Sequence, residues 1–172
     1  MKFNIANSLT LTRILLIPLI VFLFLSNEES YRIIIFYLFL LATITDYLDG
    51  FFARYMKQVT SFGEFLDPVA DKLLVIITLI LLITENQDIF FLVPVLIIIT
   101  REFLVIAIRQ RLAEVGENVK LSVLLISKIK TAIQLTSLLL LLFKFSLFGI
   151  DIYQLGIYLL QIASLLTLIS FF

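Results

Sequence analysis

The sequence predicts an all-α integral membrane protein with six transmembrane helices and both termini in the cytoplasm. The chain has 172 residues, of which 62% are hydrophobic, whereas a soluble domain is about 45–50% apolar. The excess apolar residues fall in long runs separated by short polar breaks, which is typical of a protein that crosses the membrane several times. No stretch rich in Pro, Gly or Ser divides the chain, so residues 1–172 are expected to form a single domain.

Six apolar runs come close to the length of about 20 residues that a transmembrane helix needs. They cover residues 8–25, 31–55, 68–84, 89–112, 121–143 and 153–172. The first run follows residues 1–7 without a small-residue cleavage site, so we expect a retained span and not a signal peptide.

Lys and Arg residues are concentrated on alternate sides of the predicted spans. Those before the first span and in the second-to-third and fourth-to-fifth connections are Lys2, Lys57, Arg109, Arg111 and Lys120, with Arg54 and Lys128 close by. The opposite connections carry Arg32 and Lys144, which are offset by Glu28, Glu29, Glu85, Asp88 and Asp151. Because cytoplasmic connections carry the excess of basic residues, this pattern places both termini in the cytoplasm of a bacterial-type plasma membrane.

The composition limits which side chains can act as general bases or metal ligands. The chain has no Cys and no His, so disulfides and thiolate–metal sites are excluded. A general base or metal ligand must therefore be a carboxylate, a lysine or a tyrosine. The net charge is zero, so there is no global basic field and no nucleic acid is expected as a partner.

Four aspartates are the main functional signal in the sequence. Asp46 and Asp49 lie three residues apart near the end of the second run, and Asp67 and Asp71 lie four apart at the start of the third. At about 100° per residue, each pair falls on one face of a helix, provided that the third helix begins near Gly63. The two helices would then point four carboxylates at one place.

These carboxylates indicate a metal site. Each charge near the membrane core costs about 2.5–3.5 kcal/mol on insertion scales, so four like charges need a cation to hold them together. Oxygen ligands without His or Cys suit Mg²⁺ or Mn²⁺ and not Zn²⁺. Mg²⁺ is usually shared with substrate phosphates, and a pair of such ions is a known device for phosphoryl transfer. Gly50 and Gly63 leave room for a bulky ligand, and Arg54 can grip a phosphate.

Two other roles are open to acidic residues inside a membrane. They can form ion pairs, or they can line the pathway of a cation transporter. A transporter is expected to carry charges at several depths and helices broken near the midplane. Here the acids cluster at one end of two spans, beside glycines and an arginine, which favours an enzyme.

The aspartates belong to a longer pattern, Asp46-x-x-Asp49-Gly50-x-x-Ala53-Arg54, eight further residues, and then Gly63-x-x-x-Asp67-x-x-x-Asp71. This pattern resembles, without a departure, the signature of the CDP-alcohol phosphotransferase family. The resemblance implies the six-helix fold of that family, usually a homodimer, with a two-metal site that opens to the cytoplasm. It implies that all four aspartates bind metal and that Asp71 is also the general base. The residues implied to hold the CDP moiety are Asp49, Gly50, Ala53, Arg54 and Gly63.

Other segments resemble the branch of this family that forms phosphatidylglycerol phosphate and CMP from CDP-diacylglycerol and glycerol 3-phosphate. These segments are residues 7–13 with Pro18, 65–72, 100–102 leading to Arg109, 113–116 and 127–131. The resemblance implies membrane lipids as neighbours and glycerol 3-phosphate as the acceptor.

An acceptor with its own phosphate needs a cationic pocket. Arg101 sits within an apolar stretch, which is costly unless it faces a polar cavity, and Lys128 and Lys130 lie early in the fifth span. Arg109 and Arg13 complete the candidate set, Arg109 because its spacing from Arg101 resembles the family.

Different roles are open to the same basic residues. Arg101 can form an ion pair with Glu102 or an aspartate, and Lys128 and Lys130 can extend to anionic headgroups. Within the family, phosphatidylglycerol as acceptor would make the chain a cardiolipin synthase, and inositol phosphate or serine would give other lipids.

Overall fold

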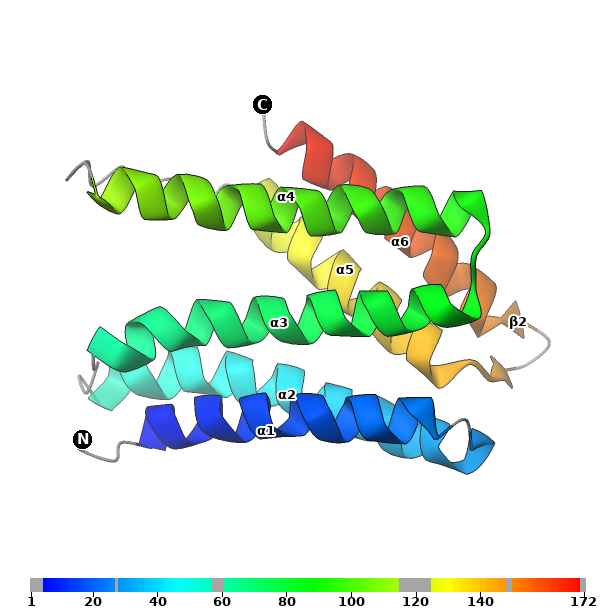
Figure 1. Ribbon diagram of the computed structural model, residues 1–172, viewed down its shortest axis with the longest axis horizontal. Helices are drawn as coiled ribbons and strands as arrows, with labels where there is room; N and C mark the ends of the chain where they lie inside the picture. The colour runs from blue at the N-terminus through cyan, green and yellow to red at the C-terminus, as the bar shows by residue number, and fades with distance from the viewer. Residues whose placement is uncertain (1–4, 27, 57–60, 115–124, 148–149, 171–172) are drawn as a thin grey trace. The chain divides into compact units, whose positions relative to one another are not determined.

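A computed structural model describes residues 5–26, 28–56, 61–114, 125–147 and 150–170 (Figure 1). Six α-helices and one two-stranded ribbon occur within these residues. The helices are α1 (Ile5–Leu25), α2 (Glu29–Met56), α3 (Ser61–Glu85), α4 (Ile89–Glu114), α5 (Leu125–Phe143) and α6 (Ile152–Ile169). The helical architecture is therefore confirmed for the described residues, while the crossing of the membrane by all six helices stays a prediction.

Within the described residues, the helix bounds agree with the apolar runs to within three residues except at the start of α3. Helix α3 begins at Ser61, seven residues before the expected start of the third run at residue 68. Hydropathy identifies the apolar part of a helix and not its ends. The first two turns of α3 contain the polar residues of the aspartate motif, so they were not recognised as helical. Residues 121–124, where the fifth run was expected to start, lie outside the described residues.

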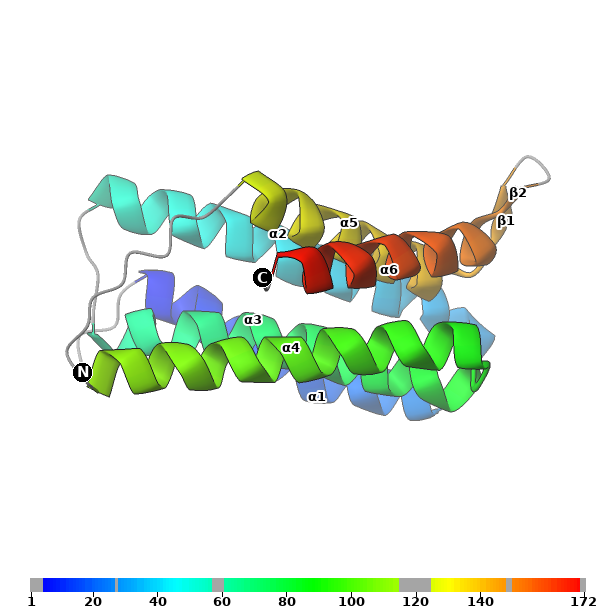
Figure 2. The ribbon, with the colours of Figure 1, turned by 90° about the horizontal axis from the view of Figure 1, so that it is seen from above.

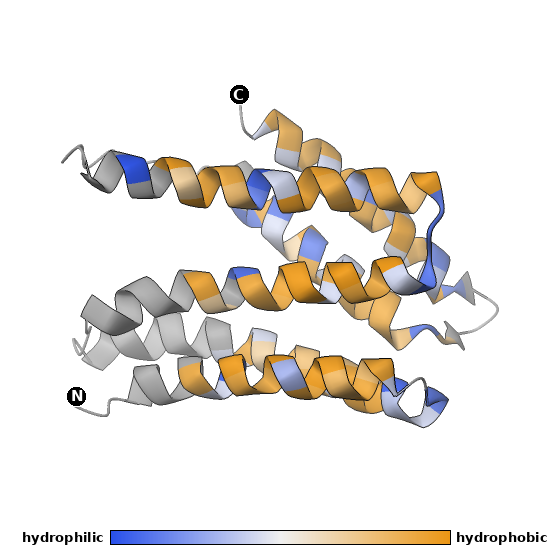
Figure 3. Cartoon of the chain, in the orientation of Figure 1, coloured by the Kyte–Doolittle hydropathy of each residue, from blue (hydrophilic) through white to orange (hydrophobic). Residues whose placement is uncertain are grey.

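Among the residues that the structure describes, two helices contain segments that are long and apolar enough to cross a membrane. They are Ile89–Ile108 in α4 and Ile152–Ile169 in α6, and a shorter apolar segment covers Leu11–Leu25 in α1. Large apolar side chains stay exposed on these helices, such as Leu15 at 71% and Phe103 at 63%, and hydrophobic residues dominate the described parts of α4 and α6 (Figure 3). An aqueous surface rarely carries so much apolar area, so these helices indicate a membrane protein.

The chain divides into two compact units. Unit 1 comprises Met1–Leu82 and Leu142–Lys144, and unit 2 comprises Ile83–Leu141 and Phe145–Phe172. The single domain expected from the sequence stays a prediction.

In unit 1, α1 and α2 pack against each other in opposite directions (Figure 1). At the end of α1, the Ser26 N–H and hydroxyl both donate to the Phe22 carbonyl, at 3.1 and 2.8 Å. The buried apolar side chains of this unit include Ile17, Ile20, Phe24, Ile35, Phe39, Ala42, Ala70, Leu74, Leu79 and Leu82. Apolar residues on α1, α2 and α3 thus face inward as well as outward.

In unit 2, α4 and α6 pack together and run in the same direction (Figure 2). Strands β1 (Ser146–Leu147) and β2 (Ile150–Asp151) form an antiparallel ribbon after α5. Asp151 then caps α6, since its Oδ1 accepts the Gln154 backbone N–H at 3.2 Å, which satisfies a donor of the first turn. The ribbon and cap set where α6 starts.

Helices α5 and α6 meet at a glycine. The Ser137 hydroxyl donates to the Gly156 carbonyl at 2.8 Å. A Cβ at position 156 would lie 2.9 Å from Leu141 Cγ and 3.2 Å from the Leu141 backbone nitrogen. Gly156 therefore permits the close approach of the two helices.

Candidate active site

The backbone of the aspartate motif is helical throughout its described part. Asp46 and Asp49 lie in the last turns of α2, and Asp67 and Asp71 lie in the first turns of α3. With a rise of 1.5 Å per residue, the members of the two pairs are separated by about 4.5 and 6 Å along their helix axes. Helix α3 includes Gly63, which meets the condition stated for a shared face, so the backbone places each pair on one face of its helix.

The two motif-bearing helix ends are close in the chain. Residues 57–60 alone separate Met56 from Ser61, and five residue steps span at most about 18 Å. The end of α2 and the start of α3 lie at the same end of unit 1, on the left in Figure 1. This arrangement is compatible with one site that draws on both helices.

The side chains of the motif lie outside the described residues. They are those of Asp46, Asp49, Gly50, Ala53, Arg54, Gly63, Asp67 and Asp71. Among the side chains that the structure does describe, no group of three or more acidic residues could hold a metal ion. The convergence of the four carboxylates thus stays a prediction that rests on their helical spacing.

The donor set fits a hard divalent cation. The helices offer carboxylate oxygens at both ends of a short connection, and the chain has no Cys or His that would select a softer metal.

The basic candidates differ in their surroundings. Lys130 and Arg13 are buried, with exposed fractions of 2% and 1%, and Lys128 is exposed. The Arg101 side chain is 14% exposed. Arg13 belongs to unit 1, while the other three belong to unit 2. The side chain of Arg109 lies outside the described residues.

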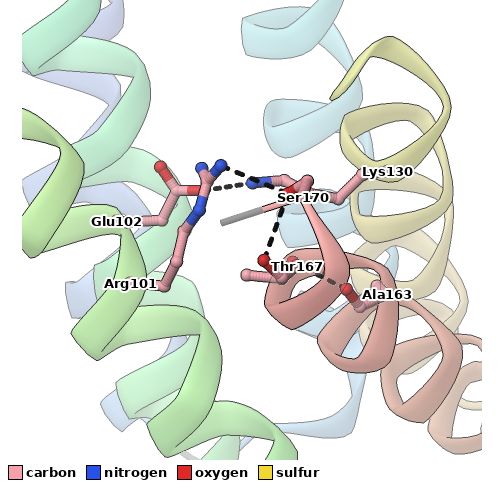
Figure 4. A network of polar contacts seen from close by, with 6 residues as sticks. All are labelled: Arg101, Glu102, Lys130, Ala163, Thr167 and Ser170. Carbon is pink, nitrogen blue, oxygen red and sulfur yellow. Dashed lines mark hydrogen bonds and ion pairs between the residues drawn. The ribbon is translucent and has the colours of Figure 1, made fainter. Parts of the chain in front are cut away.

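Within unit 2, the structure brings Arg101 and Lys130 to the same carboxylate (Figure 4). Glu102 Oε1 lies 3.1 Å from Lys130 Nζ and 3.6 Å from Arg101 Nη1. The ion pair between Arg101 and Glu102, one of the alternatives that the sequence left open, is therefore present. Lys130 does not extend to a headgroup but lies against Glu102.

The other end of the Arg101 guanidinium meets the residue that caps the C-terminus of α6. Arg101 Nη2 donates to Ser170 Oγ at 3.3 Å, and Ser170 Oγ donates to the Thr167 carbonyl at 3.1 Å. Figure 4 shows these contacts joining α4, α5 and α6.

Two members of this cluster are not among the site residues predicted from the sequence. Glu102 adjoins Arg101 in the sequence and was expected only as a possible ion-pair partner of Arg101, not as a member of the site. Ser170 is 69 residues from Arg101, and nothing in the sequence pattern connects them.

The Glu102 carboxylate lies between two cations, Lys130 and Arg101. Glu102 is 1% exposed, so water screens its attraction to Lys130 poorly. Removal of one partner from such a pair costs far more than its net contribution to stability, because a charge stays buried without compensation. These contacts hold the partly exposed Arg101 guanidinium in a defined position.

Comparison with known proteins identifies the family. The model of the CDP-alcohol phosphatidyltransferase family matches residues 3–169. The chain belongs to this family. Its members generally use divalent metal ions, in agreement with the donor set of α2 and α3.

Similar proteins come from several bacteria. A protein of Wigglesworthia glossinidia brevipalpis is 42% identical over 175 residues, which covers 100% of this chain and 94% of that protein. One from Haemophilus influenzae is 43% identical and covers 80% of this chain and 75% of its own length. One from Rickettsia typhi is 43% identical, with 97% and 92% covered. All three bear the name CDP-diacylglycerol–glycerol-3-phosphate 3-phosphatidyltransferase.

Proposed function

We propose that this chain transfers the phosphatidyl group of CDP-diacylglycerol to glycerol 3-phosphate, and so acts as a phosphatidylglycerophosphate synthase. The observation that carries the proposal is the similarity to relatives named for this reaction, which reaches 42% identity over the whole chain. The intact aspartate motif on α2 and α3 supports the same chemistry.

In this proposal, the carboxylates of Asp46, Asp49, Asp67 and Asp71 hold two Mg²⁺ or Mn²⁺ ions. When bound, such ions would neutralise the charge that grows on the departing CMP. The CDP moiety is held by Asp49, Gly50, Ala53, Arg54 and Gly63. Glycines let a bulky ligand approach the helix backbone, and the Arg54 guanidinium matches the geometry of a phosphate.

Asp71 takes the proton from the acceptor hydroxyl. The oxygen of that hydroxyl attacks the phosphorus nearest the diacylglycerol, and a new phosphorus–oxygen bond forms. The bond from this phosphorus to the bridging pyrophosphate oxygen breaks, and CMP leaves with the electron pair. Crowded carboxylates titrate together, so Asp71 acts as a member of the group and not with a pKa of its own.

The phosphate of the acceptor binds to basic residues. Arg101 is the leading candidate, because it is partly exposed and its guanidinium can bind a phosphate through two nitrogens. Lys130 lies behind it on Glu102 and adds positive potential. Lys128, Arg109 and Arg13 are the other candidates.

The same proposal places the chain in a bacterial-type plasma membrane. Six spanning helices and cytoplasmic termini are supported by the basic connections, and a homodimer is supported by the resemblance to the family. The active site then faces the cytoplasm, where glycerol 3-phosphate, a charged and water-soluble compound, reaches it without crossing the bilayer.

An acceptor panel tests the function. Purified protein receives CDP-diacylglycerol, Mg²⁺ and one acceptor at a time: glycerol 3-phosphate, phosphatidylglycerol, inositol phosphate or serine. We expect CMP release and formation of phosphatidylglycerol phosphate with glycerol 3-phosphate and with none of the other three acceptors. Turnover with phosphatidylglycerol instead would indicate a cardiolipin synthase, and metal-dependent ion flux in vesicles without CMP release would indicate a cation transporter.

A further inference from the structure

The C-terminal end of α6 contacts a residue of the candidate acceptor site. The Ser170 hydroxyl lies against the Arg101 guanidinium, and Glu102 lies against its other terminal nitrogen. We propose that Ser170 and Glu102 are positioning residues, which hold Arg101 so that its remaining N–H donors bind the phosphate of the acceptor. This proposal rests on the proposed function for the chemistry of the acceptor.

The hydrogen bonds of Ser170 fix the direction of its hydroxyl. A serine hydroxyl has one proton to donate and two lone pairs that accept. The proton goes to the Thr167 carbonyl at 3.1 Å, so the lone pairs remain for Arg101 Nη2 at 3.3 Å. Because Ser170 is the C-cap of α6, its hydroxyl is held by the helix end.

Glu102 fixes the other terminal nitrogen. Its Oε1 lies 3.6 Å from Arg101 Nη1, and Lys130 Nζ lies 3.1 Å from the same oxygen. The carboxylate is buried, so its position is set by packing and by the α5 lysine. Ser170 and Glu102 therefore each hold one of the two terminal nitrogens of the Arg101 guanidinium.

The guanidinium keeps donors for a ligand. It has five N–H groups in a rigid plane, and the contacts to Ser170 and Glu102 involve only the two terminal nitrogens. Arg101 Nε is buried and makes no hydrogen bond with any of the described residues. A buried donor that lacks an acceptor is unfavourable, and a phosphate oxygen would supply that acceptor.

A purely structural role for Arg101 would be to stabilise the C-terminal end of α6. A cation there is favoured by the helix dipole and by the last carbonyls. That role accounts for the contact of Arg101 Nη2 with Ser170. It does not account for Arg101 Nε, which is buried without a hydrogen-bond acceptor. It also predicts that a loss of the Ser170 hydroxyl changes stability without changing affinity for the acceptor.

The test compares steady-state kinetics of purified full-length variants, with CDP-diacylglycerol and Mg²⁺ saturating and glycerol 3-phosphate varied. We expect Ser170→Ala to raise KM for glycerol 3-phosphate about fivefold, with kcat changed by less than about twofold, as for the loss of one hydrogen bond of ordinary strength. Ser170→Thr keeps the hydroxyl and should restore KM. Glu102→Gln should raise the same KM.

The matched control is Ser164→Ala. Ser164 lies on the same helix and is buried, and its hydroxyl donates to the Gln161 carbonyl at 2.7 Å, a hydrogen bond within α6. This variant should leave KM unchanged. Thermal unfolding of every variant separates a loss of folded protein, which lowers kcat, from a change in KM.

A double variant tests whether Ser170 acts through Arg101. In an Arg101→Lys background the Nη2 partner is gone, so Ser170→Ala should add less than about twofold to KM. An unchanged KM in Ser170→Ala, or an undiminished effect of Ser170→Ala in the Arg101→Lys background, overturns the proposal. If another phosphorylated acceptor is used in place of glycerol 3-phosphate, the proposed function fails, but the same coupling measured with that acceptor still tests the positioning.

Discussion

Asp71 is the residue on which the proposed proton transfer depends. Replacement by Asn keeps the size of the side chain but removes both the base and a metal ligand. We expect Asp71→Asn to lower kcat for CMP release by about 10²–10⁴-fold, the usual contribution of a positioned general base. Asp88→Asn is the control, since Asp88 is exposed between α3 and α4. Full CMP release by Asp71→Asn would exclude Asp71 as the base.

Lys144 is a residue under local strain. It is the one described residue other than glycine with a positive φ, 48°, a conformation that Asn adopts more readily than Lys. Loss of hydration and, next, the nearby Arg32 lower the pKa of Lys144 below 10.5, although Glu29 acts in the opposite direction. We expect Lys144→Asn to stabilise the protein through the backbone term alone, by a part of the roughly 1–2 kcal/mol that the left-handed conformation costs.

The lowered pKa gives this prediction a pH dependence. Between the folded-state pKa of Lys144 and 10.5, the unfolded chain binds more protons, so wild-type stability rises as pH rises through that window. The advantage of Lys144→Asn should therefore be largest near neutral pH and shrink towards pH 10.5. Thermal unfolding in detergent measures it. Lys144→Gln removes the charge but keeps the strain, so it separates the two causes, and equal Tm values for Asn and Gln would argue against the backbone term.

At the scale of the element, Gly156 sets the contact of α6 with α5. A new Cβ would lie 2.9 Å from Leu141 Cγ and 3.2 Å from a backbone nitrogen, and that nitrogen cannot rotate away. Alanine favours a helix over glycine by about 1 kcal/mol, while overpacking costs about 1–3 kcal/mol. We expect Gly156→Ala to lower Tm in detergent. Leu165→Ala, at a position 60% exposed on the same helix, should lower it less, and a higher Tm in Gly156→Ala would show that the helices adapt.

The elements also show which features a sequence can predict. The starts and ends of α1, α2 and α4 follow from apolar runs, because the bilayer demands a fixed length of apolar helix. The start of α3 does not, because polar motif residues continue a helix beyond its apolar part.

The candidate site likewise has one part that the sequence predicts and one part that it does not. The Asp46–Asp71 pattern is local, so its helical spacing could be read directly and the family could be recognised. The contact of Arg101 with Ser170 joins residues 69 apart, and no periodicity encodes which hydroxyl of α6 lies beside α4. Burial of Lys130 on Glu102 was likewise not predicted, since a lysine near a membrane surface more often extends to water.

At the scale of the whole molecule, metal binding should couple to stability. A ligand that binds only the folded state stabilises it by about 2.7 kcal/mol when its concentration is 100 times its Kd. We expect chelation to abolish CMP release and added Mg²⁺ or Mn²⁺ to restore it. Mg²⁺ should also raise the Tm of the wild type but not that of Asp67→Asn. An equal rise in both would place the stabilising ion outside the aspartate motif.

Membrane orientation is the last prediction, and the composition makes it easy to test. The chain has no cysteine, so a single introduced cysteine is a unique reporter. Lys57 lies in the connection between α2 and α3, which the basic residues place in the cytoplasm, and Asp88 lies in the connection between α3 and α4, which they place on the opposite side.

We therefore expect a membrane-impermeant maleimide to label Asp88→Cys in intact cells and Lys57→Cys only in inverted vesicles. CMP release by both variants is the control for a native fold. Labelling of both from the same side would mean that α3 does not cross the bilayer. Labelling of Lys57→Cys in intact cells and Asp88→Cys in inverted vesicles would reverse the orientation, and the aspartate motif would then face away from the cytoplasmic glycerol 3-phosphate that the proposed reaction requires.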